Sequence, residues 1–306
     1  MYTIALLNSQ TATKYQYLTF PSYQKHLSQI GSKIIAIGAS LIQQPIGLAL
    51  AQIESESEGR VAKVLSLFVK QRYRNSGIAT ALMAELEAQL LAKGCNKVKL
   101  VYMSGKPSTP ILEKLLTKLN WQQSRSRMLV CRSTTAKIAT APWLQKYRLA
   151  SAYTLLPWID LVPQSKQKIV QQQSQKKWYP ETLSPFKQQH QLEPLNSLCL
   201  LYRGDVVGWM ITHRIDPTTI RYTSLFIRED LQKVGRAIPM LAAAIARQVE
   251  SEVVNGIWTV ELDNDRMLQF VKRRLAPYLT SLTETRSREK LLVSTPSSLK
   301  QSCLSN

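Results

Sequence analysis

The sequence predicts an α/β protein that contains two copies of one domain, and three observations support this prediction. The chain has 306 residues, enough for two domains of about 150 residues each. A segment that begins at Ser66 recurs at Ser224, 158 positions later, without a gap. In both copies a short apolar run precedes a polar turn with a glycine, and a run with helical periodicity follows.

The first copy of this segment predicts a strand, a loop and a helix. Leu67–Val69 is a short apolar run, as expected of a buried strand, and Arg74–Gly77 is a polar turn. From residue 78 to 93 apolar residues recur every four positions on one helical face, and Gly94 ends the helix. This order directs free backbone N–H groups and the positive end of the helix dipole at one point, which favours phosphate binding.

The second copy, Ser224–Ala237, has the same order, and Gly235 again lies 158 positions after Gly77. A period of this size indicates a duplicated domain rather than a solenoid repeat. We place the boundary in the small, polar segment Ser133–Pro142, which gives domains of residues 1–138 and 139–306.

The remaining elements follow the same order in each half. Residues 1–31 carry no motif; we expect a strand over Tyr15–Phe20 and a helix that begins at Pro21. A hairpin should then precede each copy of the segment, and a strand, a helix and a closing tail should follow it. The hairpin strands are Ile34–Ile37 with Ile46–Leu50, and Leu198–Tyr202 with Val206–Ile211; the later strands are Lys97–Tyr102 and Ile257–Leu262; the tails are Ser124–Val130 and Arg286–Val293.

Composition limits the classes of function. The 40 Lys and Arg against 20 Asp and Glu give a net charge of +20, which favours anionic partners such as coenzyme A phosphates, nucleic acid or anionic lipid. No apolar run reaches the roughly 18 residues of a membrane span, and no signal peptide is visible. Scattered cysteines and three isolated histidines predict reduced thiols, a cytoplasmic location and no metal site.

The loop at Arg74–Ala79 resembles the pyrophosphate-binding motif of the GNAT superfamily of acetyltransferases, Gln/Arg-x-x-Gly-x-Gly/Ala at the start of the central helix. The run Leu67–Val69 resembles the splayed strand of that family, whose backbone pairs with the pantetheine arm. All three specified positions of the motif match in both copies, as Arg74, Gly77 and Ala79, and as Gln232, Gly235 and Ala237.

The resemblance implies two tandem GNAT-like domains, each a mixed sheet flanked by helices, with acetyl-CoA as the cofactor. The residues expected to bind it in the first copy are Phe68, Val69, Arg74, Asn75, Ser76, Gly77, Ile78, Ala79 and Thr80, with Arg74 adding charge. Their counterparts in the second copy are Ile227, Gln232, Lys233, Val234, Gly235, Arg236 and Ala237. We expect the second copy to be degenerate, because the Arg236 side chain would lie beside the cradle and Pro239 lacks an N–H in the first helical turn.

The sequence lacks the residues that the family often uses for proton transfer. Where the family often carries a glutamate, this chain has Lys63 in one copy and Arg221 in the other. The family's tyrosine acid is replaced by Leu116, although Asn120-Trp121 resembles the neighbouring Gly-Phe pair. Tyr102, at the end of a strand beside the site, is the candidate acid, and a structural tyrosine is the alternative. The acidic loop residues Glu54, Glu56 and Glu58 fit either a water relay or a solvated loop.

The predicted function is therefore acetyl-CoA-dependent transfer of an acetyl group to an amine that the sequence does not identify. Two alternatives remain open: a pseudoenzyme that binds acyl-CoA and regulates, or a basic acetyltransferase-like protein associated with RNA or the ribosome. Many GNAT proteins dimerise, and two fused copies can replace such a dimer, so we expect a monomer.

Overall fold

The computed structural model describes residues 1–57, 59–146, 148–232 and 235–293. It divides into two compact units. The first contains Met1–Ser126 together with the chain from Thr285 onward, and the second contains Arg127–Glu284. Each unit is an α/β domain with six strands of the sheet order and its own hydrophobic core, as expected of two copies of one fold.

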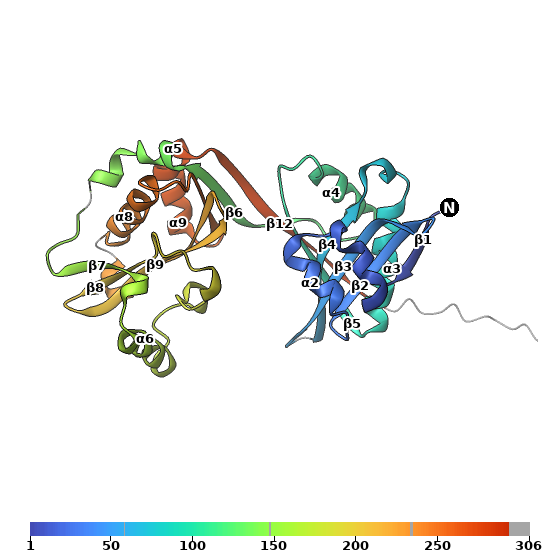
Figure 1. Cartoon of the computed structure of the whole chain (residues 1–306), viewed down its shortest axis with the longest axis horizontal. Helices are drawn as coiled ribbons and strands as arrows, with labels where there is room; N and C mark the ends of the chain where they lie inside the picture. The colour runs from blue at the N-terminus through green and yellow to red at the C-terminus, as the bar shows by residue number, and fades with distance from the viewer. Residues whose placement is uncertain (58, 147, 233–234, 294–306) are drawn as a thin grey trace, which may run out of the picture. The chain divides into compact units, whose positions relative to one another are not determined.

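The first unit, blue to teal in Figure 1 apart from the red strand β12, contains mixed parallel and antiparallel strands in the order β1-β2-β3-β4-β5-β12. Strands β4 and β5 run parallel, and the other neighbours are antiparallel. The strands are β1 (Thr3–Leu6), β2 (Ile34–Leu41), β3 (Gln44–Glu56), β4 (Gly59–Val69), β5 (Cys95–Met103) and β12 (Ser281–Leu291). The helices are α1 (Ser9–Ala12), α2 (Pro21–Ser28), α3 (Ile78–Ala92) and α4 (Thr109–Lys118), with 3₁₀ turns η1 (Thr13–Leu18) and η2 (Gln71–Tyr73).

Both faces of this sheet are covered, because side chains alternate across a strand and both sets are apolar. On one face Ile35 and Ile37 of β2 pack with Leu82 and Leu86 of α3. On the other face Leu48 and Leu50 of β3 pack with residues of the N-terminal segment, including Ala12, Tyr15, Leu18 and Leu27. The expected helix at Pro21 is present, but residues 13–18 form the 3₁₀ turn η1 rather than a strand, and the first strand is Thr3–Leu6.

The second unit, green to orange in Figure 1, repeats the arrangement in the order β6-β11-β10-β9-β8-β7. Strands β10 and β11 are parallel, like β4 and β5. The strands are β6 (Arg125–Thr134), β7 (Tyr153–Pro157), β8 (Leu198–Tyr202), β9 (Asp205–Asp216), β10 (Thr219–Ile227) and β11 (Asn255–Glu261). The helices are α5 (Thr135–Ala139), α6 (Pro163–Gln175), α7 (Glu229–Gln232), α8 (Ala237–Val249) and α9 (Asp265–Phe270). Short turns complete it: η3 (Pro142–Gln145), η4 (Trp158–Asp160), η5 (Glu181–Leu183), η6 (Gln189–Gln191), the π-helical η7 (Val271–Leu275) and η8 (Ala276–Tyr278).

The two closing strands do not stay with the halves of the sequence in which they lie. From Thr285 to Leu291, β12 pairs antiparallel with β5 and so completes the sheet of the first unit. Residues 128–134 of β6 pair with β11 in the second unit. The units therefore differ from the expected single division between residues 138 and 139, because a domain contains the strands that pair in its sheet rather than a continuous stretch of chain.

Candidate functional site

In the first unit, the parallel strands β4 and β5 separate part-way along their length. They pair from Arg60–Cys95 to Val64–Leu100, and β4 then continues to Val69 paired with β3 alone among the described residues. The separation begins at a β-bulge, where Leu65 has no partner on β3. The edge of Leu67–Val69 that faces β5 thus carries backbone groups available to a ligand, with Val69 buried and Phe68 37% exposed.

The second unit has the same bulge and the same separation. Strands β10 and β11 pair from Thr219–Asn255 to Tyr222–Trp258, and β10 then continues to Ile227. The bulge falls at Thr223, 158 positions after Leu65. The duplication therefore extends to an irregularity of the backbone, and both units keep the strand separation that the family resemblance predicts.

The loop after β4 leads directly into the N-terminus of α3. Asn75 and Gly77 adopt left-handed φ angles of 63° and 79°, which turn the chain into the helix. No side chain caps α3, so its first N–H groups, beginning at Ile78, have no helical partner and point out of the helix end. A Cβ added at Gly77 would meet only the Tyr2 hydroxyl, at 3.9 Å, which leaves open space for a ligand to approach the backbone.

Arg74 stabilises this loop through a hydrogen bond to the backbone at the end of β4. Its Nε donates a hydrogen bond to the Val69 carbonyl at 3.1 Å, and Ser76 Oγ donates one to the Tyr73 carbonyl at 2.6 Å. In the second copy Gln232 Nε2 donates to the Ile227 carbonyl at 2.8 Å. Because the motif's Gln/Arg makes the same bond in both copies, its first role is to shape the loop, and any charge that Arg74 supplies comes from its exposed guanidinium end.

The loop of the second copy has the same glycine turn, but the residues that follow the glycine differ. Gly235 has a φ of 69°, and α8 begins two residues later at Ala237. The Arg236 guanidinium lies over the Tyr153 ring, 4.6 Å from the ring centre, in a cation–π contact that the sequence did not predict. Pro239 is buried in the first turn of α8 and supplies no N–H. Two predicted members, Lys233 and Val234, lie outside the described residues.

The residues at the family's carboxylate position do not form a catalytic arrangement. Lys63 Nζ pairs with Glu54 at 2.5 Å, and the neighbouring Lys99 pairs with Glu56 at 3.1 Å, all on exposed or half-exposed side chains. These ion pairs occupy Glu54 and Glu56, the candidates for a proton relay, which lie at the end of strand β3 rather than in the expected loop. Glu58 lies outside the described residues. In the second copy Arg221 donates hydrogen bonds to Gln188 and Thr223.

Tyr102 lies on β5 and its hydroxyl donates a hydrogen bond to Glu113 of α4 at 2.9 Å. Glu113 also pairs with Arg286 of β12 at 3.0 Å, and Arg286 is the residue opposite Tyr102 in the sheet. Burial, followed by the bond to Glu113, raises the pKa of Tyr102. The bond to Arg286 lowers the pKa of Glu113. Leu116, at the position of the family's tyrosine, is fully buried.

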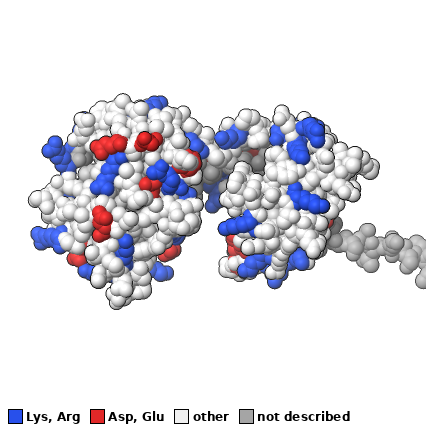
Figure 2. Space-filling view, in the orientation of Figure 1, with Lys and Arg blue, Asp and Glu red and all other residues white. Residues whose placement is uncertain are grey.

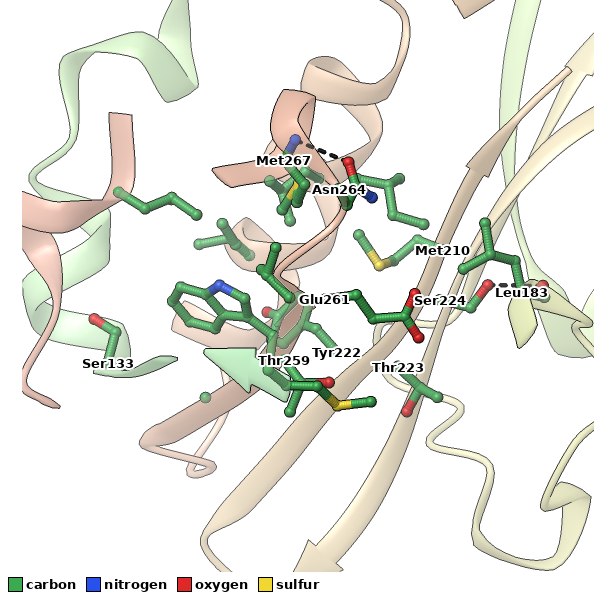
Figure 3. A pocket seen from close by; sticks show the side chains of 18 of the residues that line it. Ser133, Leu183, Met210, Tyr222, Thr223, Ser224, Thr259, Glu261, Asn264 and Met267 are labelled. Atoms are coloured by element: carbon green, nitrogen blue, oxygen red, sulfur yellow. Dashed lines mark hydrogen bonds between the residues drawn. The ribbon is translucent and has the colours of Figure 1, made fainter. Parts of the chain in front are cut away.

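Sequence reasoning missed a cavity of about 620 Å³ in the second unit. It lies where β10 and β11 separate, and Figure 3 shows side chains of β10, β11 and α9 directed toward it. Apolar side chains form most of its wall, including Met128, Met210, Leu225, Leu241, Ile245 and Trp258. Glu261, the last residue of β11, is directed into it. The available signal was an acid at the end of an apolar strand.

The described residues give no support for a metal site or for a membrane-spanning helix. Among residues 1–57, 59–146, 148–232 and 235–293, no group of three or more His, Cys, Asp or Glu side chains is placed to hold a metal ion. In the same part of the chain no helix is long and apolar enough to cross a membrane. Cys95, Cys131 and Cys199 are buried free thiols, and burial raises the pKa of Cys131 and of Cys199 to about 11.

Comparison with known proteins finds a family model that matches part of the first half of the chain. Residues 5–116 match the model of the Acetyltransferase (GNAT) family. No curated protein gives a significant match.

Solved structures resemble the whole chain. A tandem GNAT protein from the clavulanic acid biosynthesis pathway, without AcCoA, aligns over 96% of this chain and all of its own, with a TM-score of 0.65 and 10% identity. A GCN5-related N-acetyltransferase from Sphaerobacter thermophilus aligns over 96% of both chains, with a TM-score of 0.56 and 12% identity. The glucosamine N-acetyltransferase region of a fungal β-N-acetylglucosaminidase aligns over 95% of this chain and 38% of its own, with a TM-score of 0.60 and 12% identity.

Proposed function

Starting from a chain that carries a GNAT-family acetyltransferase domain and has the fold of tandem GNAT proteins throughout, we propose an acetyl-CoA-dependent N-acetyltransferase whose cofactor site lies in the first unit. The observation that carries the proposal is the joint geometry of the β4–β5 separation and the uncapped N-terminus of α3. The acceptor is an amine, and a location in the cytoplasm fits the buried free thiols.

The first unit has groups suited to both the pyrophosphate and the pantetheine arm of acetyl-CoA. The N–H groups from Asn75 to Thr80 surround a helix N-terminus with no capping side chain, where a pyrophosphate is favoured by hydrogen bonds and by the helix dipole. The open edge of Leu67–Val69 offers backbone groups to the amides of a pantetheine arm, and Phe68 is exposed beside it. When bound, the cofactor supplies an acetyl thioester that is ready for attack by an amine nitrogen.

The second unit offers a poorer phosphate site. Pro239 removes one donor from the first turn of α8. The glycine turn and the bond from Gln232 to the Ile227 carbonyl remain, so the backbone shape survives while the set of donors is reduced. We therefore assign the working cofactor site to Arg74–Thr80 and regard the second copy as degenerate for coenzyme A.

Proton removal determines the pH dependence. An attacking ammonium must lose a proton, and the described side chains near the β4–β5 separation present no free base. Lys63 is paired with Glu54, and Tyr102 already donates its proton to Glu113. The chain's contribution is then to bind and orient the reactants, which is a large part of many enzymes' rate enhancement. The amine must arrive unprotonated, so the rate should follow the concentration of free amine.

The test is release of thiol from acetyl-CoA with a panel of diamines, amino sugars and lysine peptides. We expect amine-dependent release that Gly77→Val abolishes. For an amine that titrates near pH 10, kcat/KM should rise about tenfold per pH unit between pH 7 and 9. A rate that is flat in this range would show that the protein supplies a base. Binding of coenzyme A without release, across the panel, would replace this proposal with the pseudoenzyme.

The net charge of +20 is the observation that favours an anionic macromolecular partner. On the face shown in Figure 2, Lys and Arg side chains are scattered over both units with Asp and Glu among them, rather than gathered in one continuous patch. Retention on immobilised polyanion at rising salt tests this alternative. Nucleic-acid binding through many phosphate contacts would show a steep loss of retention with salt, and we expect a shallow one.

A further inference from the structure

We propose that the cavity between β10 and β11 of the second unit is a binding site for an apolar molecule with a protonated amine, and that Glu261 is the counter-ion. This inference concerns the second unit and holds whether or not the first unit transfers acetyl groups. It rests on the size of the cavity, on the chemistry of its wall and on the hydrogen bonds that the wall already makes.

The cavity suits a small organic ligand. Its volume of about 620 Å³ lies within the usual range of small-molecule sites, roughly 300–1,000 Å³. Three methionines line it, Met128, Met210 and Met267, and their flexible side chains adapt to apolar ligands of different shape. The wall therefore favours an apolar body.

The polar groups in the wall are largely occupied by bonds within the protein. The Tyr222 hydroxyl donates to Gln248 Oε1 at 2.7 Å, and Gln248 Nε2 donates to the carbonyls of Val253 and Asn255. Ser224 Oγ donates to the Leu183 carbonyl at 2.8 Å. These groups hold the strands in place, and burial raises the pKa of Tyr222, so its hydroxyl stays neutral.

Other polar residues at the cavity are occupied in the same way. Asn264 Oδ1 accepts the N-cap bond from the Met267 N–H at 3.0 Å, and Ser133 Oγ donates to the Tyr278 carbonyl at 2.6 Å. Thr223 Oγ1 bonds to His213 Nδ1 at 2.7 Å. A ligand that needs several neutral hydrogen-bond partners would have to break these bonds.

Trp258 and Glu261 are exceptions. The indole Nε1 of Trp258 is buried without a hydrogen-bond partner among the described residues, and the unpaired charged group belongs to Glu261. Within the part of the chain that the structure describes, its carboxylate makes no hydrogen bond or ion pair. Figure 3 shows the carboxylate extending from β11 toward Met210 and Ser224, and the side chain is exposed, so a ligand can reach it. The cationic residue at the cavity, Lys187, is 4.0 Å from Glu181 and already has a partner. The unpaired charge of the site is thus negative, within a chain of net charge +20.

These features together select the ligand class. A carboxylate beside an apolar wall binds a protonated amine through charge-assisted hydrogen bonds, which are stronger than bonds between neutral groups. An anionic ligand would face Glu261 directly. At the corresponding strand end of the first unit stands Met103, so the acid is a feature of the second copy alone.

The test compares three ligands with one aromatic body, 2-phenylethylamine, 2-phenylethanol and 3-phenylpropanoate, by calorimetric titration of the full chain without coenzyme A. We expect the amine to bind about tenfold more tightly than the alcohol, and Glu261→Gln to remove that difference while leaving the alcohol's affinity unchanged. Glu252→Gln, which removes an exposed carboxylate outside the cavity, is the matched control and should change nothing.

Several results would overturn the proposal. They are no binding by any of the three ligands, equal affinity for amine and alcohol, tightest binding of the carboxylate, and insensitivity to Glu261→Gln. Competition between coenzyme A and the amine in the Gly77→Val variant would also overturn it, because the cavity would then be a pantetheine channel. Amine binding that persists in Gly77→Val separates this site from the cofactor site of the first unit.

Discussion

Lys63 stands on β4 where the family's catalytic carboxylate is often found, and its ammonium pairs with Glu54 at 2.5 Å. The lysine side chain is 48% exposed, so this is a surface pair of small energetic value, about 1 kcal/mol or less. Among the described residues around it, none gives Lys63 a catalytic role.

We therefore predict that Lys63→Ala leaves kcat/KM for the best amine within about threefold of the wild type. Initial rates of thiol release measure this directly. A loss of about 10²-fold or more, the scale of general acid–base catalysis, would show that Lys63 takes part in proton transfer.

We interpret Tyr102 as a structural tyrosine, because its hydroxyl already donates a hydrogen bond to Glu113. We predict that Tyr102→Phe changes kcat by less than about threefold and lowers the free energy of unfolding by about 1.5–3 kcal/mol, the value of one bond to a charged group. The pKa of Tyr102 is raised from 10.0, so the stability that the neutral phenol contributes is fully present below pH 10 and is lost as the pH rises above it.

Denaturant titrations of wild type and variant at pH 7, 9 and above 10 test this sign. The difference in unfolding free energy should be the same at pH 7 and 9 and should shrink above pH 10. A difference that vanishes already at pH 9, or a large loss of kcat, would contradict the structural assignment.

For single residues, the sequence predicted the backbone conformation of the two glycines but not the partners of the arginine side chains. Gly77 and Gly235 were expected at tight turns before helices, and both have left-handed φ angles. The inward bond of Arg74 and the stacking of Arg236 on Tyr153 could not be predicted, since each depends on a partner whose position the tertiary fold decides.

Among the elements, the closing strand β12 joins a sheet that its local sequence does not identify. Both tails contain Arg-Ser-Arg, so the sequence alone does not say which sheet each joins. In the structure Arg288 and Lys290 of β12 bond to groups of the first unit, Arg288 to Thr117 and Lys290 to Glu87. Such bonds join residues 171 and 203 positions apart, which no periodicity reveals.

The Lys290–Glu87 pair gives the prediction for this element. Glu87 is largely buried, and its carboxylate accepts bonds from Lys290 Nζ at 2.6 Å and Trp121 Nε1 at 2.8 Å. Lys290→Ala leaves a buried carboxylate with one partner, at a cost of about 3 kcal/mol, or roughly 6–12 °C in melting temperature. Lys99→Ala, which breaks the exposed pair with Glu56, is the control and should cost about 1 kcal/mol or less.

Hydrogen exchange locates the effect. Lys290→Ala should reduce protection in β5 and α3 of the first unit and leave α8 of the second unchanged, although Lys290 lies near the C-terminal end of the sequence. Equal loss of protection in both units, or a loss confined to the second, would contradict the assignment of β12 to the first sheet.

For the whole molecule, the duplicated α/β fold was predictable because the second copy matches the first in register over the strand, the loop and the start of the helix. The mixed sheet in each unit confirms that prediction. The cavity beside Glu261 was not predictable, because its wall combines residues from 128 to 275 that only the fold brings together.

The oligomeric state follows from the duplication. We predict that light scattering gives a mass close to the 34.7 kDa of one chain, because two domain copies in one chain take the place of a dimer of single copies. A mass of twice this value at micromolar concentration would show that the chain associates further.

The central claim is that the first copy binds coenzyme A and the second does not, and the matched glycines test it most directly. Gly77 and Gly235 both have left-handed φ angles, so a valine strains both turns similarly, and an added Cβ would meet at most the Tyr2 hydroxyl at 3.9 Å. Ligand at 100 times its dissociation constant should stabilise the wild type by about 2.7 kcal/mol, or roughly 5–10 °C in melting temperature. We predict that coenzyme A gives this shift in the wild type and in Gly235→Val, and none in Gly77→Val. A shift that survives in Gly77→Val and disappears in Gly235→Val would place the cofactor in the other half of the chain.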